Sequence, residues 1–290
     1  MSFEAIIFEP LSFVFMQRAL LMAVLTAAVC AVLSCYLVLK GWALMGDAVS
    51  HAVLPGIVLA HVLALPLSIG AFVAGLFSAV ATGYLNANSR IKEDTAMGIV
   101  FSGMLALGLV LYLKVETDQH LDQILFGNLL GVRIGELVEV AVVSAVVIGI
   151  VVLKRRDLLL YCFDPDHARA IGLRTNVLYY GLLVLLALAI VASIKTVGII
   201  LVVALLIGPG AAGYLVSNRF DRMLIVAVSV AISASVIGTL LSYHIDGATG
   251  PCIVLVQAGL VLAAFAWSRI AEQRSQSAAK SPTQSTAPSG

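Results

Sequence analysis

The sequence predicts an all-α polytopic membrane protein with about nine transmembrane helices. Of its 290 residues, 61% are hydrophobic and 11% are charged, whereas about 25% charged residues is usual in soluble domains. Its mean hydropathy is +1.07. Apolar runs of roughly 18–20 residues, long enough for a helix to cross a bilayer, recur along the chain. Together these observations exclude an ordinary soluble domain.

The apolar segments follow one another in a clear order. Residues 1–13 are amphipathic and interrupted by Pro10, so we expect an interfacial lead-in. The predicted membrane domain covers 14–270, with spans at 15–39, 43–63, 67–85, 95–113, 134–153, 176–193, 197–216, 223–243 and 252–267. An apolar piece within 122–133 is too short to span, and we expect it to be re-entrant or interfacial. Other interpretations of that piece give eight or ten spans.

Two stretches outside the spans have their own character. The insert 157–175 is the longest non-spanning segment with helical content. Pro165 can open a short helix there, with Asp164 as its cap, and Gly172 can end it. The tail 271–290 is rich in Ser, Thr, Ala and Pro, and we expect it to be disordered.

The distribution of basic residues predicts the orientation. If the polar loop 86–94 is cytoplasmic and the spans alternate, thirteen Lys and Arg residues lie on the inner side and four on the outer side. Cytoplasmic loops of membrane proteins carry the excess of positive charge. We therefore expect the N-terminus outside and the C-terminus, with its tail, inside.

The second span carries a carboxylate and an imidazole four residues apart, Asp47 and His51, followed by Pro55. Residues i and i+4 share one face of a helix, so these side chains can meet. An oxygen and nitrogen pair of this kind suits a divalent first-row metal ion. Ionisable groups inside a membrane are costly and tend to mark a transport pathway. Two other interpretations stay open: a buried Asp–His hydrogen bond that fixes packing, or an aspartate that caps the helix.

A group of acidic residues and a histidine follows the fourth span, in an outer loop. Its members are Glu116, Asp118, His120 and Asp122. The group is either a solvated loop or a functional surface, namely a docking site for a binding protein or an electrostatic funnel for cations.

The seventh span contains the triplet Gly208, Pro209 and Gly210. A proline inside a helix removes a backbone hydrogen bond and bends the helix. The triplet therefore predicts a kink, and a hinge for alternating access is the functional interpretation.

Several classes of function lack their sequence signature. The chain has no GxxxxGK[ST] loop for ATP, no HExxH motif and no convincing nucleophile–base pair, so we expect a transport protein rather than an enzyme. The four cysteines show no CxxC spacing, which excludes a zinc framework, and basic residues form no nucleic-acid patch.

Three motifs in order carry a resemblance to a known family. They are GDAVSHAVLPGIVLA (46–60), FDPDHARAIGL (163–173) and KTVGIILVVALLIGPGAAG (195–213). Together they resemble the membrane permease of the metal-ion ABC importers, the family that handles manganese, zinc and chelated iron. The resemblance covers about residues 10–270.

The resemblance implies the site and its partners. Asp47 and His51 would form a transient metal site, with no tightly bound cofactor. The partners would be a cytoplasmic ATPase dimer, a second permease subunit (identical or paralogous), an extracytoplasmic metal-binding protein and the lipid bilayer of a bacterial inner membrane. The insert would be the helix that couples to the ATPase, through Asp164, Pro165, Asp166, Ala168, Arg169 and Gly172.

The expected function is therefore the permease subunit of an ATP-driven importer of manganese or iron, with zinc as a third candidate. ATP hydrolysis would belong to a separate chain. The rival hypothesis is a self-sufficient secondary cation transporter, in which Asp47 and His51 relay protons or metal ions.

Overall fold

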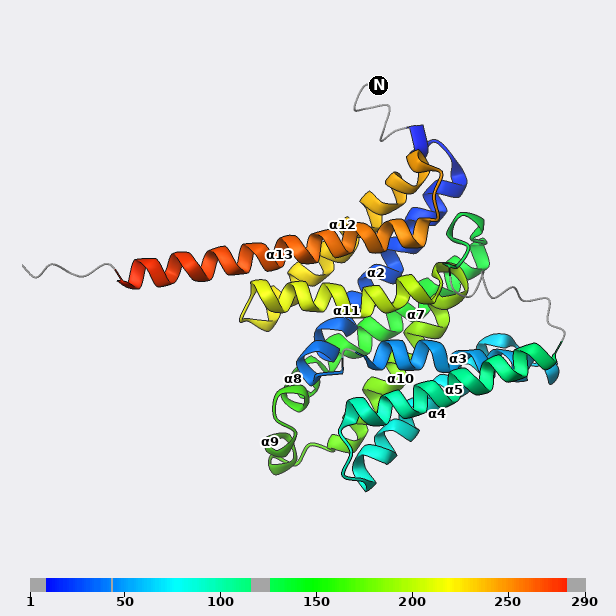
Figure 1. Ribbon diagram of the computed structural model, residues 1–290, viewed down its shortest axis with the longest axis horizontal. Coiled ribbons are helices and arrows are strands. Elements are labelled where there is room, and N and C mark those ends of the chain that lie inside the picture. Colours follow the sequence, from blue (N-terminus) through cyan, green and yellow to red (C-terminus); the bar gives the residue numbers. More distant parts are fainter. Residues whose placement is uncertain (1–8, 43, 116–125, 281–290) are drawn as a thin grey trace, which may run out of the picture.

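The computed structural model describes residues 9–42, 44–115 and 126–280, and within them it contains helices and no strand (Figure 1). The elements are α2 (Val14–Lys40), α3 (Met45–Val62), α4 (Leu67–Asn88), α5 (Glu93–Lys114), the 3₁₀ turn η1 (Leu129–Gly131), α7 (Ile134–Leu153), α8 (Arg155–Phe163), α9 (Pro165–Ala170), α10 (Thr175–Val197), α11 (Ile199–Val216), α12 (Phe220–Ile245) and α13 (Thr249–Lys280).

The described chain contains nine helices that are long and apolar enough to cross a membrane, so the expected count is confirmed. They are α2 to α5, α7 and α10 to α13. Between residues 127 and 133 the structure has only the turn η1 and irregular chain, which adds no span. The residues before it, 116–125, lie outside the described part.

Two differences from the sequence-based expectation concern helix content. The insert contains a second helix, α8, which begins at Arg155, whereas we expected one helix near Pro165. The last helix, α13, continues to Lys280, although we expected disorder from residue 271. Residues 271–280 contain no Gly or Pro, the two residues that are least favourable inside a helix.

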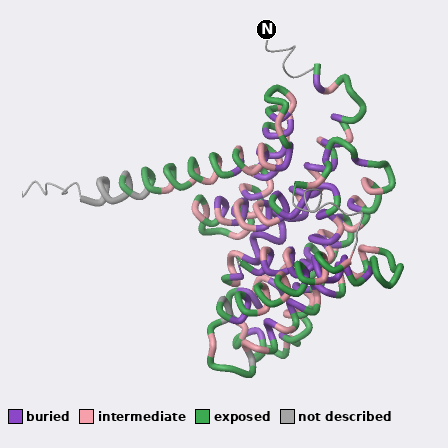
Figure 2. The backbone as a smooth tube through the Cα atoms, turned by 45° about the vertical axis from the view of Figure 1, so that its right-hand side comes forward, coloured by how far each residue is buried: buried purple, intermediate pink, exposed green. Residues whose placement is uncertain are grey.

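The spans form two packed groups that α10 joins (Figure 1). Helices α3, α4 and α5 pack against one another, and α2, α11, α12 and α13 form the other group. Helix α10 contacts α3 and α4 on one side and α2, α7 and α11 on the other. The core accordingly lies along α2, α3, α10 and α11, which have the largest buried shares among the spans. Figure 2 shows the buried residues gathered in the middle of the bundle.

A pair of glycines sets the closest helix crossing in the first group. A Cβ added to Gly56 of α3 would collide with the backbone carbonyl of Gly70 on α4, and the converse holds for Gly70. Small residues allow helix backbones to approach in a membrane, where packing and not water exclusion drives association. This contact fixes α3, which carries the candidate metal pair, against α4.

Large apolar side chains remain exposed on the outside of the bundle. Examples are Val73 and Phe77 on α4 and Ile99, Leu107 and Val110 on α5. Apolar side chains facing outward along whole helices are what a hydrocarbon environment requires, since lipid tails are as apolar as leucine.

Candidate functional site

Asp47 and His51 meet on α3 as the sequence predicts. Oδ1 of Asp47 and Nε2 of His51 are 3.3 Å apart. The Asp47 side chain is 38% exposed and the His51 side chain 23% exposed, so a third group can reach both. The pair therefore consists of a partly exposed carboxylate and a partly exposed imidazole, in a helix whose other residues are mostly buried and apolar.

Neighbouring side chains hold this part of α3 in place. The hydroxyl of Ser50 donates a buried 2.7 Å hydrogen bond to the carbonyl of Gly46. The His51 ring stands edge-on to Phe101 of α5, with 5.2 Å between the ring centroids. Gly46 lies directly against Leu206 of α11, because a Cβ on Gly46 would be only 2.9 Å from Leu206 Cδ1. The pair is thus framed by α5 on one side and α11 on the other.

The pair supplies only two ligands. Among the described residues, no group of three or more His, Cys, Asp or Glu side chains is placed to hold a metal ion. Protein metal sites usually have four to six ligands, so two side chains from one chain make an incomplete site. A metal ion bound here would need further ligands besides these two side chains.

The Gly208–Pro209–Gly210 triplet lies inside α11, which continues as a helix on both sides of the proline. Pro209 and Gly210 are buried. Leu206, which touches Gly46, is three residues before the proline. This one contact connects the helix that carries the triplet to the residue before Asp47, although 160 residues separate Gly46 and Leu206 in sequence.

The insert forms the short helix that the sequence predicts. Oδ1 of Asp164 accepts hydrogen bonds from the backbone N–H groups of Asp166 (3.1 Å) and His167 (2.9 Å), and Pro165 is the first residue of α9. Gly172 follows the helix with φ +86°, a left-handed conformation that glycine adopts without strain. Ala168 is buried, and the side chains of Asp166 and Arg169 are exposed.

The insert presents apolar side chains outside the predicted spans. Phe163 and Ile171, which flank α9, are 65% and 57% exposed. Arg155 at the start of α8 pairs with Asp221 of α12 and stacks over the ring of Phe220. Lys40, at the end of α2, lies 4.7 Å above the Tyr161 ring. The insert is therefore attached to α2 and α12, and its tip is left uncovered within the described structure.

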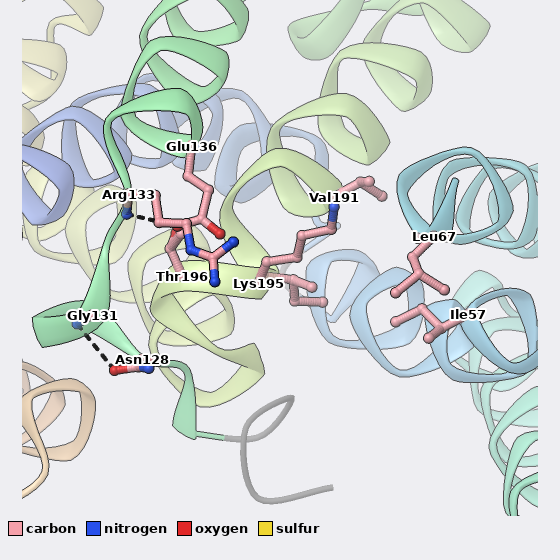
Figure 3. Close-up of a pocket in the computed structure, with 11 residues that line it drawn as sticks. Ile57, Leu67, Asn128, Gly131, Arg133, Glu136, Val191, Lys195 and Thr196 are labelled. Atoms are coloured by element: carbon pink, nitrogen blue, oxygen red, sulfur yellow. Dashed lines mark hydrogen bonds between the residues drawn. The ribbon is translucent and has the colours of Figure 1, made fainter. Parts of the chain in front are cut away.

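A cavity of about 420 Å³ lies between the end of α10 and the starts of α4 and α7 (Figure 3). Lys195, Arg133 and Glu136 are its charged lining residues. Lys195 Nζ donates to Ser68 Oγ at 2.7 Å, and Glu136 accepts from the backbone N–H of Arg133. Two cations and one carboxylate do not favour a metal cation, and neither Asp47 nor His51 lines this cavity.

The predicted acidic group, Glu116, Asp118, His120 and Asp122, lies outside the described residues. Sequence reasoning missed Arg155, Asp221, Ser34 and Gln257, which make polar contacts between different elements. A buried Gln or Ser in an apolar span is visible in the sequence, but its partner is not.

The comparisons with known proteins cover almost the whole chain. Residues 12–268 match the ABC 3 transport family. The chain is 59% identical over 266 residues to the chelated iron transport system membrane protein YfeD of Yersinia pestis, covering 92% of this chain and 90% of that protein. It is 50% identical to the manganese transport system membrane protein MntB of Synechocystis, covering 89% of this chain and 84% of that protein.

Solved structures have the same fold. PsaBC from Streptococcus pneumoniae, solved in complex with a Fab, has a TM-score of 0.81 and 39% identity, covering 90% of this chain and 94% of that chain. An inward-facing putative metal-chelate type ABC transporter has a TM-score of 0.69 over 86% of this chain and 84% of that chain. At 17% identity, this second likeness concerns the fold alone.

Proposed function

This chain belongs to the ABC 3 transport family, and we propose that it is the transmembrane permease subunit of an ATP-driven importer of a divalent transition metal. Manganese and iron are the cargo that best fit the relatives, whose names refer to manganese and chelated iron, and zinc is the third candidate. The metal ion is the substrate and not a resident cofactor. The chain itself carries out no ATP hydrolysis.

The Asp47–His51 pair is the single observation that carries this proposal. Its 3.3 Å separation and partial exposure support a role for this carboxylate and imidazole as ligands of a passing cation. Oxygen and nitrogen donors together suit Mn²⁺, Fe²⁺ and Zn²⁺.

A second permease subunit would complete the site. One chain offers two ligands, whereas a pair of permeases, identical or paralogous, would offer four. A site shared between subunits can release its ion when the subunits separate, which suits transport better than tight storage. The exposure of Asp47 and His51 supports a position from which another chain is reachable.

The insert would couple conformational changes of a cytoplasmic ATPase dimer to movement of the membrane spans. Asp164, Pro165 and Gly172 shape α9, and Asp166, Ala168 and Arg169 complete it. The exposed Phe163 and Ile171 beside α9 support a docking tip, because large apolar side chains outside the bilayer favour a protein partner. Motion of α9 would pass to α2 and α12 through the Lys40 and Arg155 contacts.

The remaining parts of the proposal concern orientation and the cycle. The N-terminus would be outside and the C-terminus inside a bacterial inner membrane, as the basic residues predict. Gly208, Pro209 and Gly210 would allow α11 to change shape as access alternates. An extracytoplasmic binding protein would deliver the metal, and Glu116, Asp118, His120 and Asp122 would be its docking site or a funnel for cations.

Uptake of radiolabelled Mn²⁺, Fe²⁺ and Zn²⁺ tests the proposal in cells that lack their own importers and express this chain with its ATPase and binding protein. Asp47→Ala and His51→Ala should each abolish uptake of one metal while the complex still assembles. His61→Ala changes an exposed histidine on the same helix and should leave uptake unchanged. Normal uptake by both pair variants would remove Asp47 and His51 from the pathway.

An ATPase-dead partner separates the proposal from its rival. The importer hypothesis requires that uptake stop, whereas a self-sufficient secondary transporter would continue. The relatives do not support the rival, because the matched family is an ABC transport family.

A further inference from the structure

We propose that Ser34 of α2 and Gln257 of α13 are positioning residues for the Asp47–His51 pair. They bind the backbone of α11 around Pro209, and α11 in turn presses on the start of α3. The inference rests on the proposed function of that pair. It also gives Gly208 and Gly210 a role, namely to leave space for the Gln257 and Ser34 side chains.

Ser34 attaches to α11 on both sides of the proline. Its Oγ accepts a 2.9 Å hydrogen bond from the backbone N–H of Gly210 and donates a 3.3 Å hydrogen bond to the carbonyl of Ile207. The Ser34 side chain is completely buried. Pro209 has no N–H, so the backbone ladder of α11 is interrupted there, and the Ser34 hydroxyl bonds one backbone group before the proline and one after it.

Gln257 of α13 forms a hydrogen bond with the turn of α11 that precedes Pro209. Its Nε2 donates a 2.6 Å hydrogen bond to the carbonyl of Ala204, and the residue is 3% exposed. Its Oε1 is buried and has no hydrogen-bond partner among the described residues. The Gln257 amide therefore connects α13 to the backbone of α11 before Pro209.

The two glycines make room for these side chains. A Cβ on Gly208 would collide with Nε2 of Gln257, and its next nearest atoms, at 3.2 Å and 3.4 Å, also belong to the Gln257 side chain. A Cβ on Gly210 would lie 2.5 Å from Oγ of Ser34 and 2.6 Å from the backbone carbonyl oxygen of Ser34. The space at Gly208 is therefore limited only by the Gln257 side chain, whereas the space at Gly210 is limited also by the backbone of Ser34.

Contact between α11 and α3 connects this arrangement to the metal pair. Leu206 lies between the Gln257 and Ser34 contacts and packs against Gly46. Gly46 directly precedes Asp47, and its carbonyl accepts the hydrogen bond from Ser50. A shift of α11 at the proline would move Leu206 and with it the backbone that carries Asp47. Misplacement of a ligand by about 1 Å is enough to weaken a site severely.

The first test measures metal dependence in the complete transporter, with its ATPase and binding protein, in liposomes. Ser34→Ala and Gln257→Ala should each raise the half-saturating metal concentration roughly tenfold, the usual effect of losing a residue that orients a ligand. The complex should still assemble, and its basal ATPase activity should change little. Ser144→Ala is the control, since Ser144 is a buried serine on α7 whose Oγ has no hydrogen-bond partner in the described structure.

The second test uses the difference between Gly208, which faces only a side chain, and Gly210, which also faces a backbone. Gly208→Ala should impair transport, and adding Gln257→Ala should restore transport to the level of Gln257→Ala alone, because the colliding atoms are then absent. Gly210→Ala should not be rescued by Ser34→Ala, because the backbone oxygen of Ser34 remains in place. If Gly208→Ala prevents folding, recovery of assembled complex in the double variant is the same measurement.

Two outcomes would overturn the inference. One is a half-saturating concentration equal to that of the wild type in both Ser34→Ala and Gln257→Ala, while Asp47→Ala abolishes transport. The other is a Gly208→Ala/Gln257→Ala double variant no better than Gly208→Ala. If Asp47→Ala itself transports with normal half-saturation, the proposed metal site fails instead, so the two failures are distinguishable.

Discussion

Replacing Asp164 by alanine should loosen α9 without disturbing the bundle. The carboxylate accepts hydrogen bonds from the N–H groups of Asp166 and His167, at 3.1 Å and 2.9 Å. Loss of an N-cap side chain costs about 1 kcal/mol, which is roughly a fivefold change in a local equilibrium. Because α9 has only six residues, far fewer than an isolated helix needs for stability, this loss should be visible directly.

Hydrogen exchange of the backbone amides at 166–171 measures that change in the reconstituted complex. Asp164→Ala should raise their exchange rates about fivefold and weaken coupling, seen as less metal transported per ATP hydrolysed. Asp164→Asn should behave like the wild type, because asparagine caps a helix as well as aspartate does. Asp166→Asn is the control for hydrogen exchange, since the Asp166 side chain is 94% exposed and is not the cap of α9.

Either of two results would refute this reasoning. If Asp164→Ala exchanges like the wild type, the cap does not hold α9. If Asp164→Asn loses coupling while its exchange stays normal, the charge of Asp164 matters to the partner and capping does not.

Two further predictions concern packing and cysteine reactivity. Gly56→Ala should destabilise the protein by about 1–3 kcal/mol or more, because the added Cβ would collide with the backbone of Gly70. Gly103→Ala on α5 is the control, since its added Cβ would meet no atom within 4 Å. Thermal unfolding compares the two variants, and equal stability would contradict the close crossing of α3 and α4. Burial raises the pKa of the Cys162 thiol to about 12, so thiolate forms only near that pH and alkylation of Cys162 should stay negligible from pH 7 to 9. The partly exposed Cys252 should be alkylated. If the N-terminus lies outside, as expected, a membrane-impermeant maleimide should reach Cys252 from the outer side. Mass spectrometry of the labelled protein shows which of the two cysteines has reacted.

The sequence determined the features that depend on neighbours along the chain. Nine apolar stretches predicted nine spans because a bilayer imposes one length on every helix that crosses it. The four-residue spacing of Asp47 and His51 predicted their contact, since helix geometry alone places them on one face. Asp164, Pro165 and Gly172 predicted the bounds of α9 because capping is local chemistry.

Tertiary structure decided which spans touch and where. A helix that is apolar on every side, such as α11, has no polar face to reveal how it is rotated, so the sequence alone could not place Ser34 and Gln257 beside the glycines of α11. The same limit hid the contact of Leu206 with Gly46 and the cavity between α4, α7 and α10. Helix α8 was missed because Arg155 and Arg156 resemble a span terminus, and only the pairing of Arg155 with Asp221 on α12 shows its place. Local periodicity fixes helices and neighbouring side chains, whereas contacts across spans depend on packing that no short segment specifies.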